Sequence, residues 1–222
     1  MWTSEDQRLY NIAYYAEHRD EEIERVRVRQ AATLEFLRDI RRRPCADCGQ
    51  TFPPWVMDFD HRDPKMKSFS LAAGHALLKP RDALLAEITK CDIVCANCHA
   101  IRTYNWIKSE DVFASRPRGT SRHLARRTAY RETHAKLLAD LRAVPCLDCG
   151  GTFAFFVMQF DHRDSREKRY VVSMMVGRTG KDRILAEVAK CDIVCANCHR
   201  ERTYQRRRAS RIDGNAGVAQ PG

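Results

Sequence analysis

Ten residues decide the fold: they read Lys90-Cys91-Asp92-Ile93-Val94-Cys95-Ala96-Asn97-Cys98-His99 and occur again, unchanged, at positions 190–199. Within this stretch Cys95 and Cys98 form a Cys-x-x-Cys pair, and His99 follows directly. Two thiolates three positions apart on a tight turn converge on one metal ion. The pair therefore predicts one half of a tetrahedral zinc site.

The other half of each site lies upstream in the chain. Cys45 and Cys48 form a second pair before the first copy, and Cys146 and Cys149 do the same before the second. We therefore predict two structural zinc ions, with the ligand sets Cys45, Cys48, Cys95, Cys98 and Cys146, Cys149, Cys195, Cys198.

The chain has ten cysteines, an even number that would also permit a secreted disulfide framework. It opens with Met1-Trp2-Thr3-Ser4-Glu5-Asp6, which lacks the basic start and apolar run of a signal peptide. No apolar stretch is long enough to cross a membrane. We therefore favour zinc over disulfides, and we expect an intracellular, cytoplasmic protein with no membrane partner. Cys91 and Cys191 are surplus to the zinc sites, and we predict that they are buried as small hydrophobic residues.

The repeat divides the 222 residues into two small units. We expect the units at residues 44–108 and 144–205, each with a helix before it. Apolar residues every three or four positions predict one long helix over 1–43, and residues 109–143 read as a basic linker and helix. Residues 206–222 read as a basic, disordered tail. Units of about 60 residues rarely build a self-sufficient core, so a metal is the expected support.

Each unit repeats one order of elements. An extended, aromatic-rich run at 52–59 and again at 153–160 predicts a strand that ends in Asp-His. A short helix follows at 80–90 and 181–190, with Leu85 and Ile88, or Leu185 and Val188, expected to face inward. The second Cys-x-x-Cys pair comes next and opens a final helix. The predicted fold class is α+β.

The net charge of +10 comes entirely from the second half of the chain. Residues 1–110 contain 17 basic and 17 acidic side chains, whereas residues 111–222 contain 22 and 12. Arginines cluster in the linker and tail, at Arg116, Arg118, Arg122, Arg126, Arg127, Arg206, Arg207, Arg208 and Arg211. Clustered arginine favours phosphate contacts, although such runs also serve as solubilising segments.

A second motif recurs at the end of the expected strand, as Asp60-His61 and Asp161-His162. A Cys-x-x-Cys pair, an Asp-His strand end and a Cys-x-x-Cys-His that opens a helix together resemble the HNH endonuclease family, in its zinc-stapled ββα-metal form. The resemblance covers about residues 44–105 and 144–205. It implies two tandem ββα-metal units that hydrolyse DNA with a divalent cation, Mg²⁺ or another.

The resemblance also implies a role for each matching residue. His61 and His162 would be the general bases. The ligands of the catalytic cation would be Asp60 with His99, and Asp161 with His199. Members of the family often have an Asn about five residues before the second Cys-x-x-Cys pair, where this chain has Lys90 and Lys190. No residue is therefore assigned to orienting the base.

The chemistry of these groups agrees with the resemblance. A neutral imidazole can take a proton from water near neutral pH, and a hard cation can stabilise the charge that develops on phosphate. Neighbouring residues on a strand point to opposite faces, so Asp60 and His61 can share a site only if the strand bends there. Asp63-Pro64 permits such a bend in the first unit, whereas the second unit has Asp164-Ser165.

Basic residues at matching positions are the candidates for phosphate contacts, together with the start of the tail. They are Arg62, Lys67, Arg102, Arg163, Lys168, Arg202, Arg206, Arg207 and Arg208. An ordinary solvated surface is an equally simple interpretation of each. The predicted partner is double-stranded DNA, although the sequence does not distinguish DNA from RNA.

Two copies of the whole set predict a single-chain pseudo-dimer that acts as a monomer and cuts both strands of a duplex. The leading alternative is a non-catalytic, zinc-dependent nucleic-acid-binding protein. That alternative gives no reason for Asp-His and Cys-His to recur together. A zinc-stapled protein-interaction scaffold is a third possibility, which the arginine-rich half disfavours.

Overall fold

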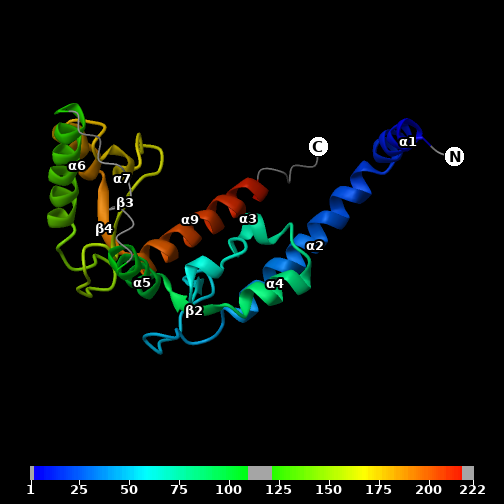
Figure 1. Ribbon diagram of the computed structural model, residues 1–222, viewed down its shortest axis with the longest axis horizontal. Helices are drawn as coiled ribbons and strands as arrows, with labels where there is room; N and C mark the ends of the chain where they lie inside the picture. The colour runs from blue at the N-terminus through cyan, green and yellow to red at the C-terminus, as the bar shows by residue number, and fades with distance from the viewer. Residues whose placement is uncertain (1–2, 110–121, 217–222) are drawn as a thin grey trace. The chain divides into compact units, whose positions relative to one another are not determined.

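The computed structural model describes residues 3–109 and 122–216, and it is a mixed α+β fold (Figure 1). The first half contains α1 (Ser4–Glu17), α2 (Arg19–Ile40), β1 (Met57–His61), the short 3-10 helix η1 (Pro64–Met66), α3 (Ala73–Ala76), α4 (Arg81–Ile88), β2 (Cys91–Cys95) and α5 (Ala96–Ser109). The second half contains α6 (Arg122–Leu141), β3 (Met158–His162), α7 (Val172–Met175), α8 (Lys181–Val188), β4 (Cys191–Cys195) and α9 (Ala196–Ala216).

The chain divides into two compact units that do not follow the boundaries of the sequence repeat. The first unit takes the described residues up to Ala46, with Gln50–Pro54 and Phe59–Ile93. The second takes Asp47–Gly49, Trp55–Asp58 and the described residues from Val94 onward. Helix α5 thus groups with the second half of the chain, because its side chains pack against α9.

The predicted N-terminal helix is two helices rather than one. α1 ends at Glu17 and α2 begins at Arg19, with His18 in a non-helical conformation between them. The first turn of α2 contains Asp20, Glu21 and Glu22. Acidic side chains are stabilising at a helix N-terminus, where they face its partial positive charge. They mark a helix start that apolar periodicity alone does not reveal.

Each half contains a two-stranded sheet, β1 with β2 and β3 with β4. β1 begins at Met57 rather than at residue 52, and β3 begins at Met158 rather than at residue 153, although only the first copy has prolines in the preceding run. The Asp-His pair does lie at the strand end, as predicted. The sequence reading missed the partner strands β2 and β4, whose residues belong to the repeated stretch.

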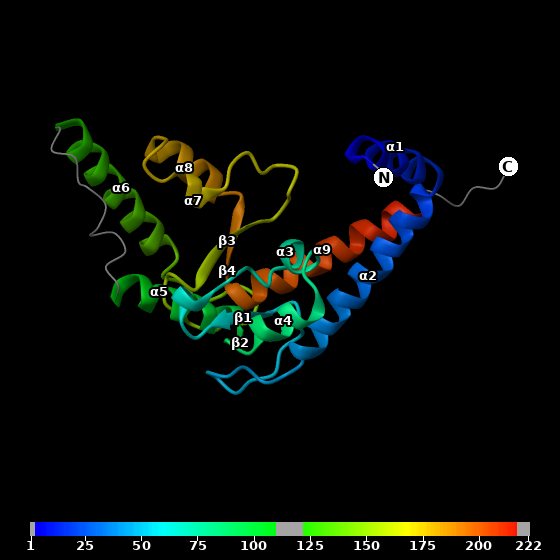
Figure 2. The same ribbon diagram turned by 45° about the vertical axis from the view of Figure 1, so that its right-hand side comes forward.

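In the second unit β3 and β4 run antiparallel and lie side by side in both views (Figures 1 and 2). The register pairs Met158 with Cys195 and His162 with Cys191. One core cluster brings Val157 and Met158 against the cysteines Cys146 and Cys195. These two predicted zinc ligands are therefore part of the core, and they fix the sheet to the loop before it.

In the first unit the core lies between α2 and α4, which run beside each other in both views (Figures 1 and 2). Leu37 of α2 and Leu84 of α4 are fully buried there. The prediction that Leu85 faces inward was wrong, since it is 43% exposed. The inward positions of α4 are instead Leu84 and Glu87, and Ile88 packs against this core as predicted.

Helix α9 continues to Ala216, beyond the predicted boundary at 205. Residues 206–216, expected to be disordered, are therefore helical; their run of arginines has high helix propensity. Arg116, Arg118 and the rest of the predicted loop at 115–121 lie outside the described residues. Among the described helices, none combines the length and apolar character needed to span a membrane.

Candidate metal and nucleic-acid site

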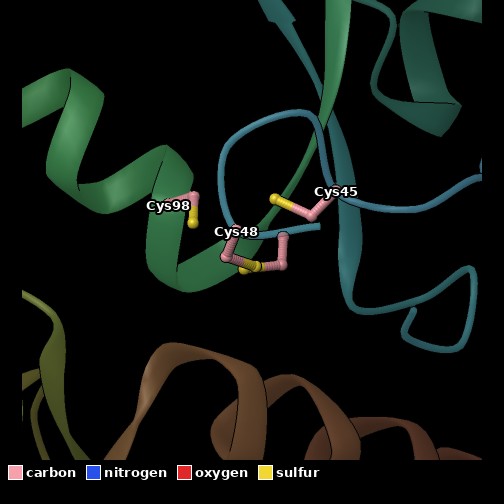
Figure 3. Close-up of side chains that lie close together, drawn as sticks. Cys45, Cys48 and Cys98 are labelled. Carbon is pink, nitrogen blue, oxygen red and sulfur yellow. The ribbon is translucent and has the colours of Figure 1, made fainter. Parts of the chain in front are cut away.

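Each repeat brings its four predicted zinc ligands together. The sulfur atoms of Cys45, Cys48, Cys95 and Cys98 lie within 4.8 Å of one another, as do those of Cys146, Cys149, Cys195 and Cys198. Figure 3 shows Cys45 and Cys48 on the loop and Cys98 at the start of α5, facing one space. Zinc–sulfur distances of about 2.3 Å place tetrahedral ligands just under 4 Å apart, so both clusters fit a structural zinc ion.

A glycine follows each upstream Cys-x-x-Cys pair. It shapes the tight turn that carries the two cysteines, which we call a knuckle. Gly49 has a φ of 70° and Gly150 a φ of 68°, in the left-handed region that side chains disfavour. This turn lets the Gly150 amide donate to the Cys146 carbonyl at 2.9 Å. The chain therefore reverses tightly enough for both thiols to face one point.

Backbone amides prepare the Cys146 thiol for metal. Burial alone would raise its pKa, but amide donors from Cys149, Cys195 and Asp148 outweigh burial and lower the pKa of Cys146 to about 7. The Cys195 amide donates to the Cys146 sulfur at 3.2 Å. A thiolate is the form that binds zinc, so this geometry favours the metal-bound state.

The two surplus cysteines are buried, as predicted. Cys91 and Cys191 lie outside the zinc-type clusters, and each sulfur contacts the carbonyl of Glu87 or Glu187, at 3.5 and 3.4 Å. Burial raises the pKa of each thiol to about 11, with the neighbouring glutamate adding to the shift. Both thiols therefore stay protonated and act as packing residues.

The predicted general bases each form a hydrogen bond with a buried glutamate. His61 Nε2 lies 2.8 Å from Glu87 Oε1, and His162 Nε2 lies 2.9 Å from Glu187 Oε1. The same glutamate oxygen accepts two backbone amides, from Ser68 and Phe69 in the first copy. These glutamates were absent from the sequence reading, although they recur at one spacing before the repeated stretch.

The electrostatics of this pair define which nitrogen of the histidine carries a proton. Burial alone would raise the pKa of Glu87, but hydrogen bonds from Lys90, His61 and two amides outweigh burial and lower the pKa to about 2. The pKa of Glu187 is lowered to about 2 by matching groups. An ionised carboxylate only accepts hydrogen bonds, so Nε2 of the histidine must donate. In the neutral imidazole the lone pair is then on Nδ1.

Lys90 and Lys190 occupy the position where the HNH family often has an Asn. Lys90 Nζ donates to Glu87 Oε2 at 2.6 Å, and Lys190 Nζ to Glu187 Oε2 at 2.7 Å. The lysine thus fixes the glutamate that holds the histidine. Orientation of the imidazole, which had no residue assigned to it, falls to this Lys–Glu pair.

The second copy brings Asp161 and His199 together. His199 Nε2 lies 3.3 Å from Asp161 Oδ1, and Asp161 is only 2% exposed. Burial raises the pKa of this carboxyl, but hydrogen bonds from Arg206 and Arg202 outweigh it, and the pKa is lowered. The imidazole therefore lies beside a carboxylate whose main partners are arginines of α9.

The first copy places an additional carboxylate beside its knuckle histidine. His99 Nδ1 lies 3.0 Å from Asp58 Oδ2, to which Arg200 also donates at 2.8 Å. A cavity of about 330 Å³ adjoins these three residues. Asp60, the predicted ligand of this copy, lies half-buried on β1. The sequence reading missed Asp58, because its matching residue is Gln159.

Asp161 and His162 leave β3 toward different helices. Asp161 contacts arginines of α9, whereas His162 contacts Glu187 of α8. The strand register continues regularly through His162, so successive side chains take opposite faces. The bend that a shared site requires is therefore not formed at this pair.

Five of the predicted phosphate contacts are held by protein acceptors, among them Arg206, which donates to Asp161. Arg62 donates to the Cys91 carbonyl at 3.0 Å, and Arg163 does the same to Cys191. Arg102 forms a two-point pair with Asp47, as Arg202 does with Asp148. Such pairs fix strand ends and knuckles to the helices. The exposed candidates that are not among these held arginines are Lys67, Lys168, Arg207 and Arg208, whereas Arg62, Arg163 and Arg206 are held but also exposed.

The starts of α5 and α9 contact each other through matching residues. The Asn97 amide donates to Asn197 Oδ1 at 2.9 Å, and the Asn197 amide donates to Asn97 Oδ1 at the same distance. Trp55 stacks on Tyr204 with ring centroids 3.7 Å apart, and the matching pair Phe156 and Tyr104 stacks at 3.9 Å. Reciprocal contacts of this kind are the mark of a two-fold interface.

Comparison of the chain with protein-family models, with curated proteins and with solved structures found no match. The HNH resemblance therefore rests on the motifs alone.

Proposed function

We propose that the chain is a metal-dependent HNH-type endonuclease that hydrolyses phosphodiester bonds of double-stranded DNA, with one site in each repeat. The observation that carries the proposal is the duplication of a chemical set. Each copy keeps the Asp-His strand end, the glutamate bonded to that histidine, and a histidine directly after the knuckle. A purely structural zinc module gives no reason to keep all three.

In this proposal the histidine acts as general base through Nδ1, and the strand end has to bend to bring it to the cation site, because β3 as described turns Asp161 and His162 to opposite faces. Glu187 accepts a hydrogen bond from Nε2–H of His162 and stabilises the imidazolium that forms when Nδ1 takes a proton from water. Glu187 is a positioning residue, because it acts through His162 and does not touch the reacting atoms.

A divalent cation would supply charge neutralisation at the phosphate and at the leaving oxygen. Asp161 and His199 would hold it in the second copy, and His99 with Asp60 in the first. The exposed Lys67, Lys168, Arg207 and Arg208 remain the candidates for contacts with the DNA backbone.

The reciprocal contacts of α5 and α9 support the pseudo-dimer form of the proposal. Asn97 and Asn197 exchange hydrogen bonds, and the two aromatic stacks use matching positions. Separate chains that cut both strands often pair through such an interface. Here the covalent link would keep the second site at a high effective concentration near the first.

One observation favours the second candidate, a non-catalytic nucleic-acid-binding protein that requires zinc. His61 and His162 are only 9% and 8% exposed, and β3 is regular through its Asp-His pair. A buried, hydrogen-bonded histidine can serve packing alone. In that case the zinc modules would only support the basic surface.

The test is incubation of the zinc-loaded protein with supercoiled plasmid and Mg²⁺ or Mn²⁺, with a parallel mobility-shift measurement. The nuclease proposal predicts that nicked or linear DNA forms in the presence of the divalent cation and does not form when the cation is withheld. The binding protein would shift DNA in a salt-dependent way and leave the plasmid intact in every divalent cation tried.

A further inference from the structure

A cavity of about 390 Å³ lies in the second unit, where α6 packs against α7 and the turn after it. Arg131, Ala135 and Leu138 line it from one face of α6, and Arg142 lines it from directly after that helix. Arg178 belongs to the turn after α7. Among the described residues that line the cavity, three are arginines and none is acidic. The cavity therefore concentrates positive charge.

The guanidinium groups of these arginines are not balanced by the described part of the protein. Arg131, Arg142 and Arg178 form no ion pair with a described carboxylate. Nε of Arg142 is buried with no hydrogen-bond acceptor among the described residues, and burial lowers the pKa of this guanidinium. Buried donors in folded proteins are nearly always paired. The arrangement therefore suits an anion that enters the cavity and supplies acceptors.

Two contacts hold the walls of the cavity in place. The Tyr130 hydroxyl donates to the Thr179 carbonyl at 2.8 Å, which joins α6 to the turn after α7. Gly177 in that turn has a φ of 71°, and a Cβ at this position would lie 2.1 Å from Cγ of Arg131. Only glycine lets the stem of this arginine lie so close to the backbone. The turn thus positions the Arg131 side chain beside the cavity.

Two of the lining residues distinguish the second repeat from the first. Gln30 and Pro54 stand at the positions that match Arg131 and Phe155, whereas Arg142 has an arginine at its matching position. Phe155 is 38% exposed, and an exposed aromatic ring can stack on a nucleobase. A charge and a ring that the first repeat lacks therefore meet at one cavity.

We propose that this cavity binds the phosphate of a nucleotide, with the arginines on the phosphate oxygens and the base beside Phe155. Guanidinium groups match the oxygens of a phosphate in geometry as well as in charge. The nucleotide can be free in solution or a unit of a single strand of DNA, since the phosphate chemistry is the same. The inference does not depend on cleavage, because the Asp-His pair and the zinc-type cluster do not line the cavity.

The experiment is isothermal titration calorimetry of the full-length, zinc-loaded chain with deoxyadenosine monophosphate, inorganic phosphate and deoxyadenosine. The wild type should bind the monophosphate more tightly than either of the other two. Arg131→Gln and Arg178→Gln should each weaken this binding about ten- to hundredfold, the contribution of one hydrogen bond from a charged group. Ala135→Glu, at an exposed position of α6, should abolish the binding because it places a carboxylate among the arginines.

Arg183→Gln is the matched control, because this arginine is exposed on α8 and does not line the cavity. Zinc content and circular dichroism check that each variant is folded. Fluorescence anisotropy with a short single strand of DNA, without divalent cation, separates the two sources of the nucleotide. If the strand binds and the monophosphate does not, greater losses in Arg131→Gln and Arg178→Gln than in the control assign the cavity to a strand.

Three results would overturn the inference: no binding of either the monophosphate or the strand, equal losses in the control and the two cavity variants, or deoxyadenosine bound as tightly as its monophosphate. Plasmid cleavage by the same protein would in each case leave the proposed function standing.

Discussion

At the scale of single residues, the buried glutamate is the group on which the local electrostatics depend. Glu187 is 3% exposed and bonds His162, Lys190 and two backbone amides. Because four donors surround it, the carboxylate stays ionised despite burial. That charge in turn sets the tautomer of the histidine.

We predict that Glu187→Gln destabilises the zinc-loaded protein by about 3 kcal/mol, since it leaves Lys190 without its buried partner charge. The lowered pKa, about 2 against an ordinary 4.5, means that this stabilisation is complete above pH 4.5 and is lost as the pH falls toward 2. Urea unfolding at pH 8 should therefore show this full difference between wild type and variant. No difference at pH 8 would mean that burial keeps the carboxyl protonated in the folded protein. Asp182→Asn, at an exposed position of α8, is the matched control.

The sequence contained part of this information at residue scale. Cysteine spacing predicted both zinc-type clusters, because four converging thiols have few other uses. Glu87 and Glu187 were missed, because an acidic residue on a short helix is ordinarily solvent-exposed, and only the packing of α4 and α8 turns it inward. Asp58 was not predicted, because its counterpart is the neutral Gln159 and the duplicated pattern does not mark it.

At the scale of elements, the knuckles join a loop, a strand and a helix that have little core of their own. Cys146 and Cys195 pack with Val157, Met158 and Val194 in one cluster. Removing the metal would leave four thiols in a space suited to thiolates, so folding of the element should depend on zinc.

We predict that Cys95→Ala lowers the zinc content from two per chain to one and unfolds the first repeat. Cys91→Ala should keep both ions, because its buried thiol contacts the Glu87 carbonyl and lies outside the clusters. Elemental analysis with circular dichroism provides the measurement. Two zinc ions retained by Cys95→Ala, or one lost by Cys91→Ala, would contradict this assignment of ligands.

Element boundaries were harder to predict than element types. The break between α1 and α2 at His18 was not predicted, because the spacing of apolar residues continues across it and the acidic start of α2 does not disturb that spacing. The strands β2 and β4 lie in the repeated stretch. That stretch was interpreted as a metal motif, and its β-propensity was not used. Ile93 and Val94, both β-branched, carried that signal.

At the scale of the whole molecule, the duplication and the contacts between its copies are the features that matter. The sequence predicted two copies of one element order, and each appears in the structure. It did not predict that α5 would group with the second half, because the exchanged hydrogen bonds of Asn97 and Asn197 depend on tertiary contact.

The most direct test of the account is the product distribution from supercoiled plasmid at saturating Mn²⁺, where both sites are expected to be occupied. The wild type should give linear DNA, while His61→Ala and His162→Ala should each give nicked circles only. The double variant, with its two zinc ions intact, should cut about 10²- to 10⁴-fold more slowly, the usual effect of removing a general base. Linear DNA from a single variant at the wild-type rate would contradict the two-site account, and wild-type cleavage by the double variant would contradict the role of these histidines altogether.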